Sequence, residues 1–147
     1  TYSQAFKGVA NWEPIYELKN HLQIPLLGNG DVLDYQDGIK RLENLDGFMI
    51  GRHAIGNPWC FQDSKKYPQP VLGERIRVAL EHYGLLCKIQ QERVAVKEFR
   101  KYLGHYVNGF QHAKAWRTRL MECESSPEFV GCMNLLQQEE GFLQLAS

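Results

Sequence analysis

The sequence predicts an α/β segment followed by an all-α segment. Two short apolar runs, residues 24–27 and 47–50, each lead into a glycine turn and are separated by a helical pattern, which is typical of buried parallel strands in βαβ units. In the later part of the chain the periodicity is helical, and no run of comparable quality suggests a strand. A polar, proline-interrupted stretch separates the two parts, so we expect one domain over residues 1–63 and a second over residues 64–147.

Local signals place the elements of the first domain in order. We expect a loop over residues 1–12 and a helix over residues 13–22, where Pro14 suits the first turn because its missing N–H needs no partner there. After the first strand, Asp34 is a suitable N-cap for a second helix. The stretch after the second strand contains glycine and proline and permits a short helical turn at most.

Two parallel strands cannot form a stable sheet by themselves. Both faces of a parallel sheet need helical cover, and each strand needs neighbours. We therefore expect the remaining strands to come from sequence outside these 147 residues. On this interpretation the chain is the C-terminal piece of a longer protein.

Four helices are expected in the second domain, over residues 72–90, 92–110, 113–124 and 127–145. The second of them has two separate faces when its residues are placed at about 100° intervals. Its apolar face carries Val96, Phe99, Leu103, Tyr106, Val107 and Phe110, and its basic face carries Arg93, Lys97, Arg100 and Lys101. The pattern predicts a helix of a bundle with a basic outer stripe.

The formal net charge is zero, but the charges are unevenly distributed. Between Lys65 and Arg119 there are twelve Lys and Arg residues against four Glu, whereas five Glu and no Lys or Arg follow from Glu122 onward. A basic middle segment suggests a polyanionic partner, and the alternative is an ordinary solvated helical face.

The four cysteines, Cys60, Cys87, Cys123 and Cys132, lack the paired spacing of a metal site. We expect them to be small buried hydrophobic residues in a reducing compartment, with no metal bound. No apolar run approaches the roughly 20 residues of a membrane span, and no signal sequence opens the chain. The prediction is a cytoplasmic protein that does not enter a membrane.

The glycine turns after the two strands suggest an anion site. In a barrel of alternating strands and helices, the loops after the last two strands commonly bind phosphate. Glycine lets backbone N–H groups approach an anion, and Arg52 adds a positive charge with fork geometry. Asp31 is expected to cap its turn or to accept from a ligand hydroxyl or a backbone N–H. The alternative is that these are ordinary strand-ending glycines.

Three stretches of the chain resemble the tRNA-dihydrouridine synthase family. They are Ile24-Pro25-x-x-Gly28-Asn29-Gly30-Asp31-Val32, then Asp46-Gly47-Phe48-Met49-Ile50-Gly51-Arg52-x-x-x-Gly56-Asn57-Pro58-Trp59-x-Phe61, and the upstream Thr1-x-x-Gln4-x-Phe6-x-Gly8-x-Ala10-Asn11-Trp12. In the helical part, Phe99-Arg100-Lys101-Tyr102-Leu103-Gly104-His105-Tyr106 with Arg117 is similar to the family's Arg-Lys-His-x-x-Trp-Tyr pattern. The resemblance covers nearly the whole chain, and its Met-Ile-Gly-Arg to Asn-Pro-Trp run is the specific part.

The resemblance implies the last βα units of a TIM barrel followed by a C-terminal helical bundle that binds tRNA. It implies an FMN-dependent reductase that uses NADPH or NADH to reduce uridine to dihydrouridine in tRNA. The residues that match the family's FMN phosphate segments are Asn29, Gly30, Asp31, Gly51 and Arg52. We expect tRNA contacts from Lys97, Arg100, Lys101, His105 and Arg117. The protein is expected to be a monomer.

The chain departs from the family in ways that bear on its role. The family's general-acid cysteine, and the Lys and His that approach the flavin, would lie upstream of Thr1, so the isolated chain is expected to be inactive. Tyr102, His105 and Asn11 replace the family's usual His, Trp and Asp. Two alternatives are a non-catalytic helical RNA-binding module and an FMN-barrel oxidoreductase that acts on a small molecule. The basic middle segment counts against the latter.

Overall fold

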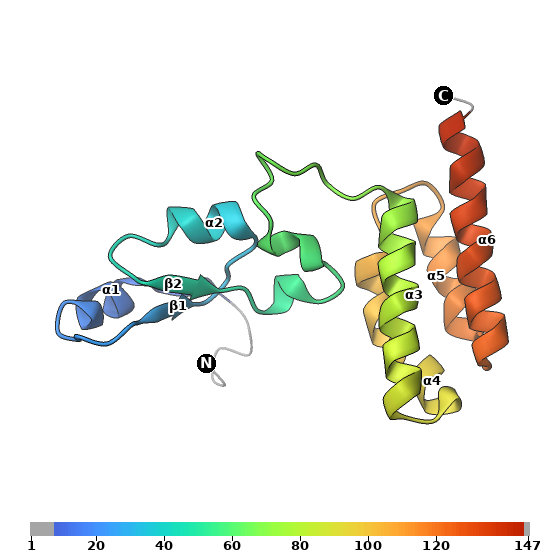
Figure 1. Ribbon diagram of the computed structural model, residues 1–147, viewed down its shortest axis with the longest axis horizontal. Helices are drawn as coiled ribbons and strands as arrows, with labels where there is room; N and C mark the ends of the chain where they lie inside the picture. Colours follow the sequence, from blue (N-terminus) through green and yellow to red (C-terminus); the bar gives the residue numbers. More distant parts are fainter. Residues whose placement is uncertain (1–7, 146–147) are drawn as a thin grey trace. The chain divides into compact units, whose positions relative to one another are not determined.

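The computed structural model describes the backbone of residues 8–145 and side chains up to residue 138. The chain divides into two compact units, with the division between Gln69 and Pro70. Each unit has its own hydrophobic core. Figure 1 shows the helices and strands of both units.

The first unit contains a short parallel sheet with two helices. Helix α1 (Glu13–Lys19) precedes strand β1 (Leu27–Asn29), helix α2 (Tyr35–Lys40) follows it, and strand β2 (Gly47–Met49) comes next. The strands are parallel, with Leu27, Gly28 and Asn29 opposite Gly47, Phe48 and Met49. Two short 3₁₀ turns, η2 (Arg52–Ala54) and η3 (Pro58–Phe61), complete the unit, where the sequence predicted one short helical turn at most.

Only one face of this sheet is covered by the described residues. A Cβ on Gly28 would overlap the Trp12 ring, and a Cβ on Gly38 of α2 would overlap the Phe48 ring, so both glycines permit close packing on that face. The opposite face exposes Leu27 and Met49, which are 62% and 52% accessible. Exposed apolar side chains on a parallel sheet fit the expectation that further strands or helices cover it.

The first strand begins later than predicted. The expectation was a strand over residues 24–27, but the ladder runs from Leu27 to Asn29. Pro25 has no N–H to donate, and the N–H of Leu26 donates to the side chain of Asp46 at 2.7 Å. Before Leu27 the chain is therefore joined to Asp46 by this side-chain bond and by one backbone bond, from the Asp46 N–H to the Leu26 carbonyl at 3.1 Å, instead of a regular ladder.

The N-cap of α2 is confirmed. The Asp34 side chain accepts from the N–H of Asp37 at 2.8 Å, with Asp34 itself in an extended conformation. Replacing Asp34 by alanine is expected to lower the free energy of unfolding of the first unit by about 1 kcal/mol, since one N–H of the first turn loses its acceptor. Urea unfolding followed by circular dichroism measures this change, and a loss below about 0.3 kcal/mol would contradict it.

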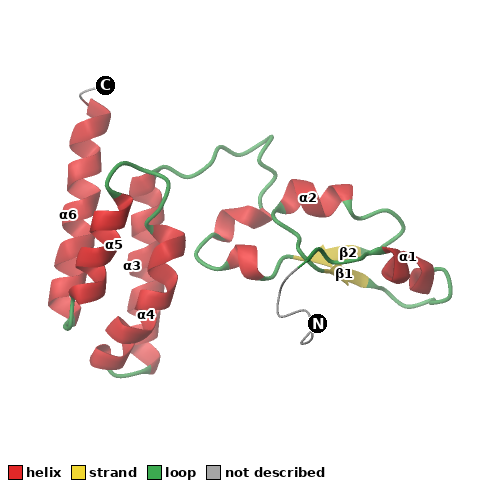
Figure 2. Cartoon of the chain, turned by 180° about the vertical axis from the view of Figure 1, so that it is seen from behind, coloured by secondary structure: helices red, strands yellow, loops and turns green. Residues whose placement is uncertain are grey.

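The second unit consists of four helices around one core. They are α3 (Leu72–Ile89), α4 (Glu92–Tyr106), α5 (Ala113–Glu122) and α6 (Ser126–Leu145), in agreement with the four predicted helices to within four residues at each end. Helix α3 packs against α4 and α6, and α5 also contacts both α4 and α6 (Figures 1 and 2). Of the predicted apolar face of α4, five side chains are buried and Phe110 is half-buried.

Helix α4 ends at Tyr106 instead of the predicted residue 110. The side chain of Asn108 donates to the carbonyls of Gly104 and His105, at 2.9 and 2.6 Å, which satisfies two carbonyls of the last turn. Gly109 follows with φ of +73°, a conformation that stops a helix.

Candidate functional site

The ends of the two strands meet at one edge of the sheet. Because β1 and β2 are parallel and Asn29 pairs with Met49, the turns that follow them emerge side by side. The Nη2 atom of Arg52 lies 2.6 Å from the Oδ1 atom of Asp31, which joins the two turns directly. The fold thus places at one edge of the sheet the five residues that the sequence predicts to bind the cofactor, namely Asn29, Gly30, Asp31, Gly51 and Arg52.

Asp31 accepts from a backbone N–H, as one of its predicted roles requires. Its Oδ2 atom accepts from the N–H of Ala10 at 2.8 Å. The residue has φ of +53°, in the left-handed region that L-residues other than Asn and Asp seldom adopt. Its side chain is 28% exposed, so it lies at the surface of the turn and not in the core.

The loop before α1 packs against Gly30 in the turn after β1. The indole Nε1–H of Trp12 donates to the carbonyl of Gly30 at 3.0 Å. Gly30 has φ of +141°, and an added Cβ would overlap the side chain of Ala10. The turn therefore requires glycine at this position for both conformation and space.

Ala10 and Trp12 are the residues that reasoning from single side chains missed. Both lie in the stretch that we expected to be a loop, and neither carries an ionisable group. The available signal was Trp12 itself, a large apolar residue with one N–H donor just before a helix, which needs both a core position and an acceptor. Trp12 has both in the structure, because its ring is buried and its indole N–H donates to the carbonyl of Gly30.

The second turn leaves room for an anion. Gly51 is exposed, and a Cβ placed on it would meet no atom within 4 Å. The Arg52 side chain is 56% exposed, and Asn29 is exposed at the end of β1. A glycine backbone with open space beside it and a guanidinium next to it are the features that a phosphate group needs.

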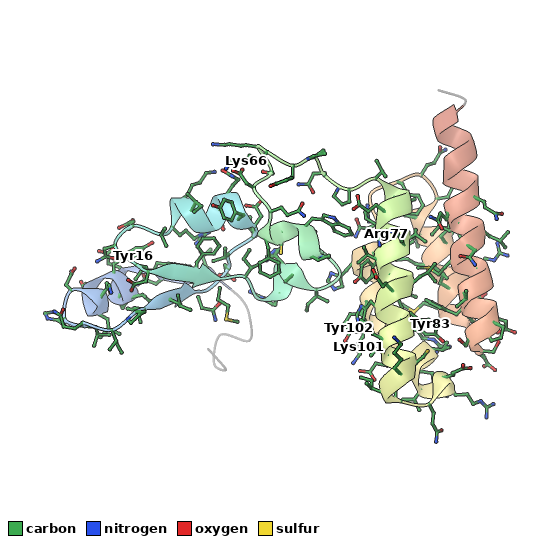
Figure 3. All side chains as sticks on the ribbon, in the orientation of Figure 1. Tyr16, Lys66, Arg77, Tyr83, Lys101 and Tyr102 are labelled. Carbon is green, nitrogen blue, oxygen red and sulfur yellow. The ribbon has the colours of Figure 1, made fainter. Side chains whose placement is uncertain are left out.

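A second candidate surface lies on α4. Arg93, Lys97 and Lys101 are all exposed and recur every four residues, about 6 Å apart along the helix. We call these three residues the α4 stripe. Lys101 forms an ion pair of 2.7 Å with Glu98 and lies 5.6 Å from the centre of the Tyr102 ring (Figure 3). The hydrogen bond from Lys101 holds the pKa of Glu98 below its ordinary value, so the pair is charged at neutral pH.

The two arginines predicted to bind RNA have contacts inside the helical unit. Arg100 is half-buried, and its Nη2 atom donates to the carbonyl of Cys123 at 3.0 Å. Arg117 is also half-buried, and its Nη1 atom donates to the carbonyl of Val107 at 2.7 Å. Each guanidinium thus binds a carbonyl just after a helix, where a positive charge is favourable.

Three aromatic rings of the helical unit, those of His105, Tyr106 and Trp116, have a chemistry that could stack on RNA bases, and they differ in exposure. His105 is exposed in the last turn of α4. Tyr106 is buried, as expected for a residue on the apolar face, and its ring stacks on Phe99 with a centroid separation of 6.0 Å. Trp116 is buried as well, with the Arg119 guanidinium over its ring. Of the three rings, His105 alone is placed to meet a ligand at the surface.

The sequence matches the model of the "Dihydrouridine synthase (Dus)" family over residues 1–145. The chain belongs to the dihydrouridine synthase family. The resemblance recognised from the strand-end motifs is therefore confirmed.

Three relatives illustrate the match, each bearing the name "Probable tRNA-dihydrouridine synthase". The protein from Mycobacterium tuberculosis (strain CDC 1551 / Oshkosh) is 35% identical over 130 residues, which is 82% of this chain and 33% of the relative. That from Rickettsia bellii is 30% identical over 92% of this chain and 40% of the relative. That from Aquifex aeolicus is 29% identical over 88% of this chain and 42% of the relative. The chain thus spans about a third to two fifths of the length of these dihydrouridine synthases.

The four cysteines of this chain are buried or half-buried and pack among apolar side chains. Cys60, Cys123 and Cys132 are buried and Cys87 is half-buried, and all four are free thiols. Burial raises the pKa of the Cys132 thiol to about 11 and also raises the pKa of Cys60 and Cys123. Buried thiols with raised pKa values are poor nucleophiles and poor metal ligands.

The described residues contain neither a membrane-spanning helix nor a cluster of metal-binding side chains. Within residues 8–145, no helix is both long and apolar enough to cross a membrane. Over residues 8–138, whose side chains the structure describes, no three His, Cys, Asp or Glu side chains gather as a metal site would require.

Proposed function

We propose that the protein carrying this chain is an FMN-dependent reductase that converts uridine to dihydrouridine in tRNA at the expense of NADPH or NADH. In this proposal residues 1–63 are the end of a TIM barrel and contribute the FMN phosphate site. Residues 64–147 form a helical bundle that binds tRNA. The observation that carries the proposal is the junction of the two glycine turns through Asp31 and Arg52 at the carboxyl ends of parallel strands.

The phosphate of FMN would be held by Asn29 and Gly30 from the first turn and by Gly51 and Arg52 from the second. The exposed glycine backbone at residue 51 allows N–H groups to approach an anion, and Arg52 supplies charge-assisted hydrogen bonds. A bound FMN supplies hydride-transfer chemistry, and the protein supplies its binding and orientation.

None of the four cysteines is proposed to act as the general acid. Three are buried, and Cys60 packs in the core with Trp12 and Val32. The catalytic cysteine is proposed to reside in another part of the full-length protein. The 147-residue chain on its own should therefore show no reduction of tRNA uridine, and any flavin-dependent turnover by it would contradict this assignment.

The second unit is proposed to bind the tRNA backbone. The α4 stripe presents three cations at regular spacing on one helix, and His105 is exposed on the same helix. Positive side chains supply affinity for phosphate that does not depend on sequence, as an enzyme acting on many tRNA molecules needs. We also propose a monomeric protein in the cytoplasm, where its tRNA substrate is found.

The full-length protein is expected to purify with FMN bound, and Arg52→Ala is expected to lose most of it. Removing the guanidinium removes the charge-assisted bonds to phosphate, so the bound fraction should fall about tenfold or more. Absorbance near 450 nm relative to 280 nm measures this fraction.

Arg77→Ala is the matched control for this experiment. Arg77 is an exposed arginine on α3 that also pairs with a carboxylate, Glu81, but it lies in the helical unit. It should retain the wild-type flavin content. A full-length protein that folds normally and binds no flavin would contradict the proposed function.

A further inference from the structure

We propose that Asp31 is a positioning residue that orients Arg52 toward the flavin phosphate and does not itself contact the cofactor. This inference rests on the proposed function, because it concerns the same phosphate site. It changes the role that the family resemblance implied for Asp31, which was direct cofactor binding.

Both oxygens of the Asp31 carboxylate already have donors from the protein. Oδ2 accepts from the Ala10 N–H at 2.8 Å, and Oδ1 accepts from the Arg52 guanidinium at 2.6 Å. A carboxylate repels a phosphate, so its position beside an anion site would be unfavourable unless its charge is compensated. The pair with Arg52 provides that compensation.

The contacts of Asp31 connect three segments of the chain. The loop before α1 contributes Ala10, the turn after β1 contributes Asp31, and the turn after β2 contributes Arg52. Asp31 itself is fixed by the adjacent Gly30, whose carbonyl accepts from Trp12. A carboxylate fixed in this way restrains the Nη2 group of Arg52 that it binds, and the other N–H groups follow because the guanidinium is rigid and their directions within it are fixed.

The ion pair of Asp31 and Arg52 has no net charge. Two explanations of how the site binds phosphate therefore predict opposite effects of removing the Asp31 charge. If attraction of the phosphate depended on net charge alone, removing the Asp31 charge would strengthen FMN binding. If Arg52 works through its orientation, the same change would weaken FMN binding, because the guanidinium would lose its charged bond to the Asp31 carboxylate. Asp31→Asn makes this distinction with little structural change, since asparagine tolerates the left-handed conformation and can still accept from Ala10.

The chain offers a matched control at the opposite ends of the same strands. Asp46 also accepts from a backbone N–H, that of Leu26 at 2.7 Å, and also pairs with a cation, Lys19 at 2.7 Å. Its hydrogen bond with Lys19 lowers the pKa of Asp46, so it is charged at neutral pH. Asp46→Asn therefore removes the same kind of interaction at a distance from the proposed phosphate site.

The experiment compares FMN with riboflavin, which has the same ring system but no phosphate. Dissociation constants of both ligands would be measured for the full-length apoprotein by flavin fluorescence, in the wild type, D31N and D46N. We expect D31N to raise the FMN constant about tenfold and to change the riboflavin constant by less than about twofold. D46N should leave the ratio of the two constants unchanged.

A second comparison tests whether Asp31 acts through Arg52. In the Arg52→Ala background, adding Asp31→Asn should have no further effect on the ratio of the FMN and riboflavin constants, because the residue that it orients is gone. An undiminished effect in that background would show that Asp31 acts by another route and would overturn the inference.

The remaining outcomes are also decisive. Unchanged or tighter FMN binding by D31N would overturn the positioning role while leaving the phosphate site intact. An equal loss for FMN and riboflavin would indicate a general structural role and would also overturn it. If the wild type bound the two ligands equally, the phosphate site of the proposed function would itself be wrong.

Discussion

Replacing Lys97 and Lys101 together by glutamine is expected to weaken tRNA binding by the 147-residue chain and to make that binding less sensitive to salt. Both side chains are exposed on α4 and one helical turn apart. Each lysine that contacts a phosphate releases a counterion, so the slope of log affinity against log salt should fall by about 1 for each lysine removed. Fluorescence anisotropy with labelled tRNA at several salt concentrations measures affinity and slope together.

Arg100 is not replaced in this variant because its side chain has a contact inside the helical unit. Sequence periodicity placed Arg100 on the basic face, but its guanidinium binds the Cys123 carbonyl, and its replacement would leave that carbonyl without this donor. A loss of binding in an Arg100 variant could then reflect a loss of stability. The two lysines make no such contact with a carbonyl among the described residues, so their removal reports on the surface alone.

Arg77→Gln with Lys88→Gln is the control for the lysine pair. It also removes two positive charges from one helix, α3, and it also breaks one ion pair, that of Arg77 with Glu81. If the two double variants weakened tRNA binding equally, net charge and not the α4 stripe would explain the affinity. Binding by the wild type that did not respond to salt would contradict the proposed interface altogether.

The sequence predicted the elements well where periodicity and caps act locally. Asp34 caps its helix as expected, and the four later helices begin within one residue of their predicted starts. The ends of the elements were less accurate because single side-chain bonds and backbone conformations, which periodicity does not report, decide them. Asn108 and Gly109 end α4 early, and just before β1 the N–H of Leu26 donates to the side chain of Asp46.

The candidate site shows the same limit. The strand-end glycines, Asp31 and Arg52 could be identified from residue type and order, because parallel strands must bring their carboxyl ends together. The hydrogen bond from Ala10 to Asp31 joins residues 21 positions apart. Its donor is a backbone N–H, which nearly every residue has, so the sequence could not indicate it. The side chains of Arg100 and Arg117 are long and can reach several partners. Helical periodicity does not tell whether such a guanidinium binds a carbonyl of its own protein, as both do, or the phosphate of a ligand.

Phe99→Ala is expected to lower the free energy of unfolding of the helical unit by about 3–5 kcal/mol. The Phe99 side chain has no exposed surface. Its ring lies between 5.1 and 6.0 Å from the ring centroids of five neighbours, on α3, α4 and α6, namely His82, Tyr83, Tyr102, Tyr106 and Phe129. Removal of the ring therefore leaves a cavity where three helices meet, and the loss of the aromatic pairs adds to the cost.

Two further variants separate this effect from a general effect of truncation on α4. Val94→Ala truncates an exposed residue of the same helix and should cost less than about 0.5 kcal/mol. Phe99→Leu fills most of the cavity and should recover more than half of the loss. Urea unfolding followed by near-ultraviolet circular dichroism reports on the aromatic cluster directly. A cost below about 1 kcal/mol for Phe99→Ala would mean that the aromatic cluster does not stabilise the helical unit, and the α4 stripe would then lack a rigid support.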